Sequence, residues 1–147
     1  MFFDNKYLEK YIKIHEISKK IKYDVEIDIS SDAYELMIPH LILQPIVENA
    51  VFHGLGQNTQ NPEISFFVSY KENTLVIEIN DNGIGIEPEK LSLMNNKEAL
   101  GYGLSNVVFR LDFYYGENYS LEFFSKDMKG TSVVMTIKNT DGLKLQN

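Results

Sequence analysis

Residues 63–86 read EISFFVSYKENTLVIEINDNGIGI, and this stretch decides the fold class. Two β-rich runs, residues 63–70 and 74–80, flank the short polar connection Lys71-Glu72-Asn73. This arrangement predicts two antiparallel strands joined as a hairpin. The rest of the chain has no repeating strand-helix-strand rhythm. We therefore expect a mixed, mainly antiparallel sheet rather than a doubly wound parallel one.

The second run leads into Asp81-Asn82-Gly83-Ile84-Gly85-Ile86. An Asn-Gly pair after a strand is a strong hairpin signal. Residues 84–88, however, are too few to pair with the whole preceding strand. The alternative is a ligand site at the strand end. Asp81 would accept a hydrogen bond from the exocyclic amine of a planar ligand, and the two glycines would let the backbone approach it.

Before the hairpin, residues 41–53 (LILQPIVENAVFH) predict a largely buried helix that Gly54 closes. Asn49 and His53 are four residues apart, so they share one face of this helix. An amide oxygen can ligate Mg²⁺ and an imidazole can donate to a phosphate. Both side chains could equally cap the helix end, and the sequence leaves these two interpretations open.

The first thirty residues predict a helix and then a strand. Residues 23–29 alternate apolar and acidic side chains, which is typical of a half-buried strand. Residues 1–20 predict an amphipathic helix whose apolar stripe is Tyr7, Tyr11, Ile14 and Ile17. This helix either packs on its own domain or ends a longer helix that enters from an upstream segment.

After the first hairpin, the sequence predicts a short polar helix over residues 88–94 and a longer one over 104–114. Gly101-Tyr102-Gly103-Leu104 opens the longer helix, where free N–H groups and the helix dipole suit a di- or triphosphate. A glycine pair before a helix is weak evidence alone.

A final hairpin joins residues 119–125 to 131–138, and Thr131 begins its second strand. The whole pattern predicts an α+β fold, a two-layer α/β sandwich with helices on one face of the sheet.

Composition excludes several classes of function. The chain has 147 residues, a net charge of −7, no cysteine, and Arg110 as its only arginine. Disulfides and thiolate metal sites are therefore excluded, and nucleic acid is not an expected partner. No stretch reaches the roughly 20 apolar residues of a membrane span, and the N-terminus lacks the features of a signal peptide. We expect a soluble, cytoplasmic domain.

Taken together and in this order, these segments resemble the catalytic, ATP-binding domain of sensor histidine kinases, and in particular the YesM/LytS-like kinases. The wider superfamily includes gyrase, a heat-shock chaperone and the MutL repair protein. Residues 43–54 match the asparagine box of the family, 81–86 its first glycine box and 101–107 its second. Arg110-Leu111, Tyr115-Gly116 and Gly130-Thr131 also fit the family pattern. The similarity runs from about Tyr7 to Lys138.

The resemblance implies ATP and Mg²⁺ as ligands. The residues that it implies at the nucleotide are Asn49, His53, Asp81, Gly83, Gly85, Ile86, Gly101, Tyr102, Gly103, Leu104 and Thr131. Asn49 would hold Mg²⁺ against the triphosphate, and Asp81 would receive the adenine amine. Residues 87–100 would form a short, mobile lid.

Two departures from related enzymes matter. In gyrase-like ATPases a glutamate one turn before the magnesium asparagine activates water, and here that position is Pro45. Glu48 lies about 100° around the helix from Asn49, so we expect slow hydrolysis. Glu48 remains a candidate to orient or deprotonate an acceptor histidine. No Pro-His-Phe acceptor sequence occurs, and Pro39-His40-Leu41 lies in the wrong place for one.

The function implied is that of a domain within a larger kinase. Residues 1–20 would be a linker helix from an upstream dimerisation and phosphoacceptor domain, 21–140 the ATP-binding domain and 141–147 a polar tail. The γ-phosphate would pass to a histidine of the upstream domain and then to a response regulator. The parent would be anchored in a bacterial cell membrane, and this piece alone would be monomeric. The alternative is a regulatory binding module that ATP reshapes without phosphotransfer.

Overall fold

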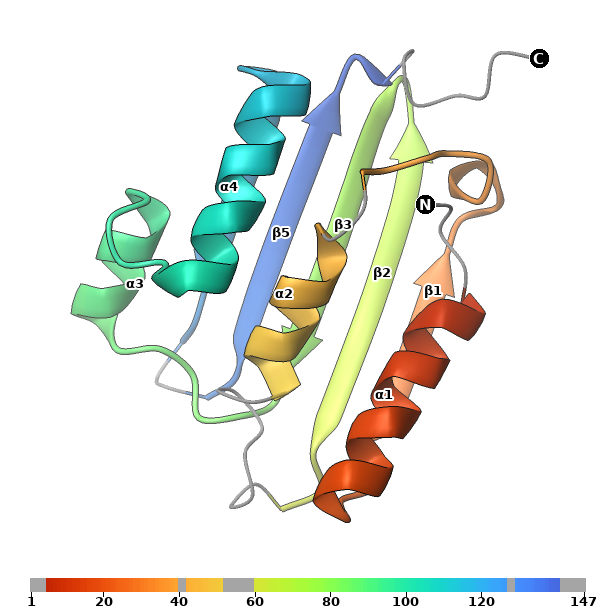
Figure 1. Cartoon of the computed structure of the whole chain (residues 1–147), viewed down its shortest axis with the longest axis vertical. Coiled ribbons are helices and arrows are strands. Elements are labelled where there is room, and N and C mark those ends of the chain that lie inside the picture. The colour runs from red at the N-terminus through yellow and green to blue at the C-terminus, as the bar shows by residue number, and fades with distance from the viewer. Residues whose placement is uncertain (1–4, 40–41, 52–59, 127–128, 141–147) are drawn as a thin grey trace.

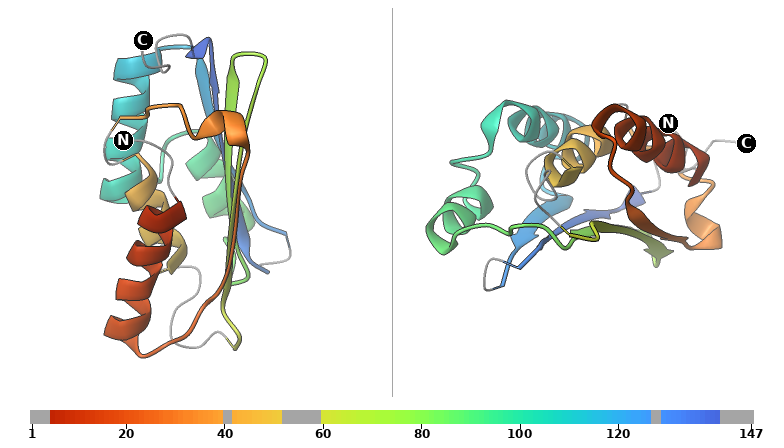
Figure 2. Two further views of the ribbon diagram at one scale, coloured as in Figure 1. Left: turned by 90° about the vertical axis from the view of Figure 1, so that its right-hand side faces the viewer. Right: turned by 90° about the horizontal axis from the view of Figure 1, so that it is seen from below.

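The computed structural model describes residues 5–39, 42–51, 60–126 and 129–140. These residues form two layers, a five-stranded sheet and a layer of helices packed on one of its faces (Figures 1 and 2). The two-layer α/β sandwich expected from the sequence is therefore confirmed. No described helix covers the opposite face of the sheet (Figure 2). The side chains on that face are polar or charged at most positions, with apolar residues at positions that include Phe67, Val76 and Val134.

The sheet is mixed and mostly antiparallel, with the strand order β1-β2-β3-β5-β4. The strands are β1 (Asp24–Ile29), β2 (Glu63–Lys71), β3 (Thr74–Asp81), β4 (Tyr119–Phe124) and β5 (Thr131–Lys138). Strand β1 runs parallel to β2, and every other neighbouring pair is antiparallel. The edges of the sheet are therefore β1 and β4.

The hairpin between β2 and β3 is tighter than the sequence predicted. Lys71 pairs with Thr74, so only Glu72 and Asn73 form the loop. Both loop residues have positive φ, 51° and 58°, as a type I′ turn requires. At the far end of β3, Asp81 pairs with Thr131, the first residue of β5. The register thus brings two predicted site residues together.

The core lies between the sheet and the helices. Alternate residues of β3 and β5 point into it and are buried, while the residues between them face the open side. The inward set on these two strands is Leu75, Ile77, Ile79, Val133, Met135 and Ile137. This period-2 alternation is the pattern that a sheet with one covered face requires.

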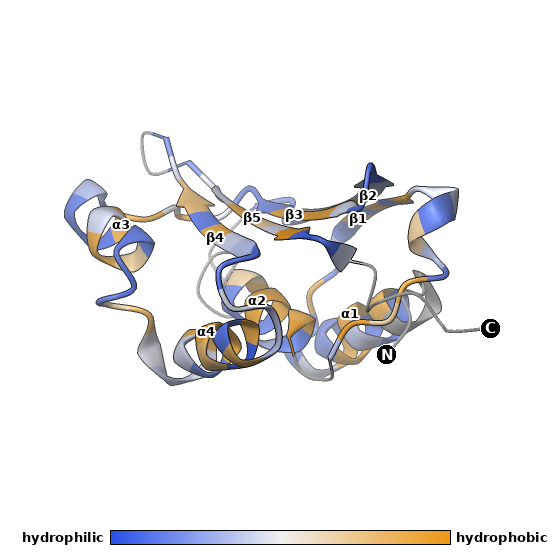
Figure 3. Ribbon diagram, turned by 90° about the horizontal axis from the view of Figure 1, so that it is seen from above, coloured by the Kyte–Doolittle hydropathy of each residue, from blue (hydrophilic) through white to orange (hydrophobic). Residues whose placement is uncertain are grey.

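The helices differ in how they meet the sheet. Helices α1 (Asn5–Lys19), α2 (Leu43–Asn49) and α4 (Gly101–Tyr115) lie on its covered face, whereas α3 (Pro88–Asn95) lies beside the edge strand β4 (Figure 3). A 3₁₀ turn, η1 (Ser31–Ala33), follows β1. Pro45 is the third residue of α2, within the first turn, where an N–H is free in any case and proline is tolerated.

The apolar stripe predicted for the first helix is wrong at two positions. Ile14 and Ile17 are 66% and 71% exposed, and the helix packs on the core through Leu8 and Ile12 instead. Residues 8 and 12 are one turn apart, so they share one narrow face. On the same helix His15 is half-buried, with its ring centroid 4.8 Å from that of Tyr11.

Candidate functional site

Four element ends lie around one space, just below α4 in Figure 1. They are the C-terminus of α2, the end of β3, the start of β5 and the N-terminus of α4. A pocket of about 560 Å³ lies among them. It is lined by Asn49, Asp81, Ile84, Gly85, Ile86, Glu87, Lys90, Met94, Ala99, Leu100, Gly101, Leu104 and Thr131.

Asp81 is one of two acidic residues that line this pocket, the other being Glu87. Its Oδ1 accepts a hydrogen bond of 2.9 Å from the Gly83 N–H, and the backbone N–H of Thr131 also donates to the carboxylate. Burial raises the pKa of Asp81 to about 6, against the opposing effect of these two hydrogen bonds. Near pH 7 the side chain is therefore an ionised, largely desolvated carboxylate, which is a strong acceptor for an N–H of a ligand.

A close backbone contact fixes the carboxylate in place. Gly130 has a φ of +76°, and its N–H donates to the Gly83 carbonyl at 2.8 Å. A Cβ at Gly130 would lie 2.3 Å from the Asp81 carbonyl oxygen, so no side chain fits there. Gly83 is buried behind Asp81 and supports it, whereas Gly85 lines the pocket itself.

A second pocket of about 210 Å³ adjoins the first and shares Asn49, Leu100, Gly101 and Leu104 with it. Pro45, Glu48, Tyr102 and Gly103 complete its lining. The Glu48 Oε1 accepts a hydrogen bond of 3.1 Å from Gln44 Nε2. Glu48 and Asn49 therefore face the same space, although they are adjacent in the helix.

The N-terminus of α4 borders both pockets. The helix begins at Gly101, three residues earlier than the sequence predicted, so its two glycines lie in the first turn. Leu100 occupies the N-cap position and provides no side-chain cap. The first-turn N–H groups are thus not satisfied by a cap, and the 15-residue helix directs its positive dipole end at this space. This is a suitable environment for an anion.

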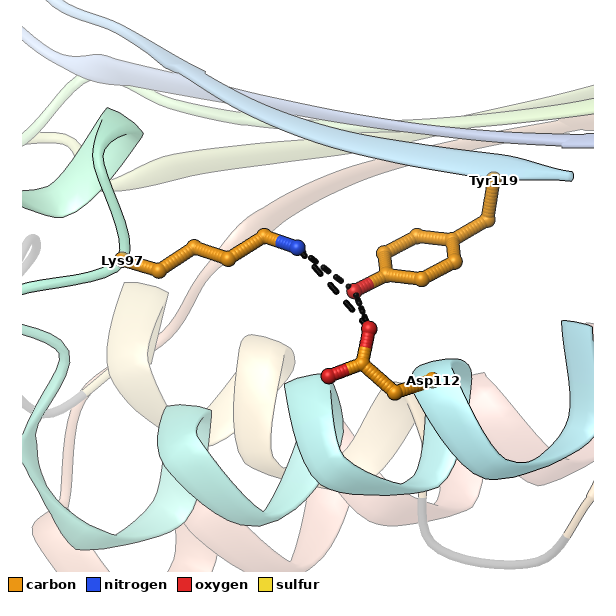
Figure 4. Close-up of polar contacts among 3 residues, drawn as sticks. All are labelled: Lys97, Asp112 and Tyr119. Carbon is orange, nitrogen blue, oxygen red and sulfur yellow. Dashed lines mark hydrogen bonds and ion pairs between the residues drawn. The ribbon is translucent and has the colours of Figure 1, made fainter. Parts of the chain in front are cut away.

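Helix α3 is attached to the edge strand at its C-terminal end. Asn95 Nδ2 donates to the Phe123 carbonyl at 2.9 Å, and the Phe123 N–H donates to Asn95 Oδ1 at 2.8 Å. Two residues later, Lys97 Nζ donates to the Tyr119 hydroxyl at 2.9 Å, and that hydroxyl donates to Asp112 Oδ1 at 2.6 Å (Figure 4). The hydrogen bond to Tyr119 raises the pKa of Lys97.

Most of the predicted site residues come together. Asn49, Asp81, Gly85, Ile86, Gly101, Leu104 and Thr131 line the larger pocket, and Glu48, Tyr102 and Gly103 line the smaller one. His53 and His40 lie outside the described residues, as does the tail from residue 141.

Several lining residues were not predicted. One is Ile84, and the others are residues assigned only to the lid: Glu87, Lys90, Met94, Ala99 and Leu100. The helical spacing of Lys90 and Met94 carries a signal, because residues i and i+4 share one face. Periodicity alone did not show that this face meets a pocket.

The described part of the chain contains neither a membrane-spanning helix nor a cluster of metal-ligating side chains. None of its helices has the length and apolar character needed to span a bilayer. No three of its histidine, aspartate or glutamate side chains come close enough to hold a metal ion by themselves.

Comparison with known proteins relates this architecture to a family. Residues 35–141 match the family model described as histidine kinase-, DNA gyrase B-, and HSP90-like ATPase. Sensor protein LytS of Staphylococcus saprophyticus is 32% identical over 135 residues, 88% of this chain and 23% of the relative. Sensor histidine kinase YesM of Bacillus subtilis is 30% identical over 127 residues, 86% of this chain and 22% of the relative.

The chain thus spans less than a quarter of the length of these two curated relatives. Among solved structures, the catalytic domain of histidine kinase ThkA has a TM-score of 0.68 at 14% identity, over 94% of this chain and 95% of that one. Histidine kinase AdeS of Acinetobacter baumannii has a TM-score of 0.65 at 16% identity, over 96% of this chain and 67% of that one. These two likenesses show a shared fold. The match over residues 35–141 shows that the chain belongs to the histidine kinase-, DNA gyrase B- and HSP90-like ATPase family.

Proposed function

We propose that this chain is the ATP- and Mg²⁺-binding catalytic domain of a two-component sensor histidine kinase. It would supply the γ-phosphate to a histidine in another domain of its parent protein. One observation carries the proposal. A single pocket joins the buried carboxylate of Asp81 to Asn49 and to the N-terminus of α4, so it offers an acceptor for a base at one end and donors for phosphates at the other.

The larger pocket suits an adenine. Asp81 accepts from the exocyclic amine, because its carboxylate is ionised near pH 7 and keeps acceptor capacity beyond its two backbone hydrogen bonds. Ile86, Met94 and Leu104 supply apolar walls for the ring. The phosphates then extend toward Gly101 and the uncapped N–H groups of α4.

The residues at the phosphate end fit a magnesium ion. The Asn49 side chain is half-buried, lines both pockets and makes no hydrogen bond to another described residue, so its amide oxygen is available. Mg²⁺ prefers few protein ligands together with waters and phosphate oxygens, which suits a single amide oxygen. When bound, the ion neutralises phosphate charge.

Glu48 is the proposed acid–base residue. It shares the smaller pocket with Asn49 and Gly103, next to where the terminal phosphate would lie. Its hydrogen bond to Gln44 orients one carboxylate oxygen and leaves the other to receive a proton from the acceptor histidine or to orient its ring. The position of the gyrase-type glutamate is Pro45, so we expect transfer to water to remain slow.

Thermal unfolding with Mg²⁺-ATP tests the nucleotide site. At 100 times its dissociation constant the ligand should stabilise the native state by about 2.7 kcal/mol. Asp81→Ala should abolish the shift, and Asp28→Ala, which removes an exposed carboxylate of β1, should retain it. No shift for the parent chain at millimolar ATP would refute the proposal.

Phosphotransfer tests the kinase assignment separately. The chain is mixed with radiolabelled ATP and the separately produced phosphoacceptor domain of its parent, and label on histidine is measured. Glu48→Gln should slow transfer by about 10²- to 10⁴-fold while leaving ATP affinity within about twofold. Label retained at the parental rate would exclude a role for Glu48. ATP binding without any labelling would favour the regulatory binding module instead.

The remaining functional context follows from this proposal. We expect the domain to act in the cytoplasm, and its parent to pass the phosphoryl group to a response regulator. Sensor protein LytS and sensor histidine kinase YesM, of which the chain spans under a quarter, support a parent protein with further domains.

A further inference from the structure

Helix α3 presents one charged face to the larger pocket. Glu87, Lys90 and Met94 all line that pocket. Lys90 and Met94 are four residues apart and share one face of the helix, and Glu87 is its extended N-cap residue. Met94 is only 4% exposed and packs into the core, whereas Lys90 is exposed. Met94 therefore packs the helix against the pocket, and Lys90, one turn before it, can direct its amine toward the pocket.

Contacts at both ends of α3 fix the direction in which this face points. Before the helix, the Ile86 N–H donates to Ser125 Oγ at 2.9 Å. At its last residue, Asn95 exchanges two hydrogen bonds with the backbone of Phe123. The Lys97–Tyr119–Asp112 cluster then ties the following turn to β4 and α4 (Figure 4). Lys90 lies between these anchors, so its backbone position is set by the fold.

Lys90 is the only lysine or arginine among the described residues that line the two pockets. The other charged side chains there are the carboxylates Glu48, Asp81 and Glu87. Among the described residues Lys90 forms no ion pair, even with Glu87 one turn earlier. A triphosphate entering a chain of net charge −7 meets repulsion, and an unpaired ammonium group beside its path is the one side-chain charge that opposes it.

We propose that Lys90 is a nucleotide-binding residue whose ammonium group pairs with the phosphate chain of the bound nucleotide. Helix α3 then contributes charge recognition as well as an apolar wall. This inference rests on the proposed function, because it concerns the same pocket. It predicts that Lys90 distinguishes nucleotides from nucleosides, since only the former carry phosphate.

Calorimetric titration of adenosine, AMP, ADP and ATP tests this inference. Lys90→Met keeps the aliphatic stem and removes the charge. It should weaken ADP and ATP binding by about fivefold to twentyfold and leave adenosine binding within about twofold. Lys90→Arg should retain most of the affinity. The AMP and ADP values show which phosphate the lysine reaches.

Lys71→Met is the matched control, because Lys71 lies at the β2–β3 turn, at the opposite end of β3 from Asp81. It should bind every ligand as the parent does. Equal affinities of Lys90→Met and Lys71→Met for ATP would overturn the inference, and so would an equal loss for adenosine, which would indicate packing on the base. If the parent chain binds none of the four ligands, the proposed function itself fails. Unligated unfolding midpoints confirm that each variant folds.

Discussion

Asp81→Asn separates the stability of this fold from its proposed activity. The substitution keeps the shape of the side chain and removes its charge. In the parent chain, burial raises the pKa of Asp81 to about 6, from an ordinary value of 3.8. The native state therefore binds a proton at this site more tightly than the unfolded state does. Between these two pH values this carboxyl makes the protein less stable as the pH rises.

The magnitude follows from the same two values. The gap between 3.8 and about 6, at about 1.36 kcal/mol per pH unit, corresponds to about 3 kcal/mol. The amide that replaces the carboxyl in the variant does not titrate, so the variant does not lose stability at this site as the pH rises. Relative to the parent, the unfolding free energy of Asp81→Asn should rise by about 2 to 3 kcal/mol between pH 4 and pH 8. The change should occur mainly between pH 4 and pH 6.

Urea unfolding of both proteins at half-unit pH steps measures this difference. Asp28→Asn is the control, since that carboxylate is exposed on the open face of the sheet. Millimolar ATP should stabilise the parent more than the variant at pH 7, because the ligand amine prefers the charged acceptor and the variant offers only a neutral one. A difference between parent and variant that does not change with pH would refute the reasoning, whatever its absolute size.

Two further substitutions test the supports of the site. Gly130→Ala should cost at least about 2 kcal/mol in urea unfolding, because its Cβ would meet the β3 backbone at 2.3 Å and its φ is +76°. Gly116 has φ 55° and ψ −117°, which also disfavours a side chain, but its Cβ would meet open space, so Gly116→Ala should cost less than Gly130→Ala, and equal costs would contradict this account. Asn95→Ala should lower the unfolding free energy by about 1 to 3 kcal/mol by leaving the Phe123 backbone unpaired. Asn96→Ala should stay within about 0.5 kcal/mol, because the Asn96 side chain makes no hydrogen bond to another described residue. If the two asparagine variants have equal unfolding free energies, the two hydrogen bonds between Asn95 and the Phe123 backbone do not stabilise the fold.

Local sequence patterns predicted most of the fold. The β-rich runs at residues 74–80 and 131–138 predict two strands. Each contains consecutive apolar residues, Leu75-Val76-Ile77 and Val133-Val134-Met135, so the structure, with one covered face of the sheet, decides which of them face the core. The first helix shows where periodicity fails. Its apolar residues are distributed around more than one face, so the spacing is compatible with two different apolar stripes. Only contact with the rest of the fold selects the stripe that contains Leu8 and Ile12.

The candidate site was predictable where its residues are consecutive and unusual, as with the glycines around Asp81 and at the start of α4. Its remaining parts depend on contacts between distant segments. Nothing in residues 88–97 shows that Asn95 will pair with the backbone of Phe123, 28 residues away. The place of Lys90 in the lining of the larger pocket depends on how α3 is held against β4, so it too required the structure.

The two hydrogen bonds between Asn95 and the Phe123 backbone also protect an edge of the sheet from pairing with another strand. A terminal strand exposes backbone N–H and C=O groups that can recruit a strand from another copy of the protein. On β4 the Asn95 amide occupies one such donor–acceptor pair, acting as a short substitute for a neighbouring strand. The opposite edge, β1, instead carries the exposed carboxylates Asp24, Glu26 and Asp28, which repel an identical copy. The two edges of this sheet therefore resist self-association by different physical means, one by hydrogen bonding and one by charge.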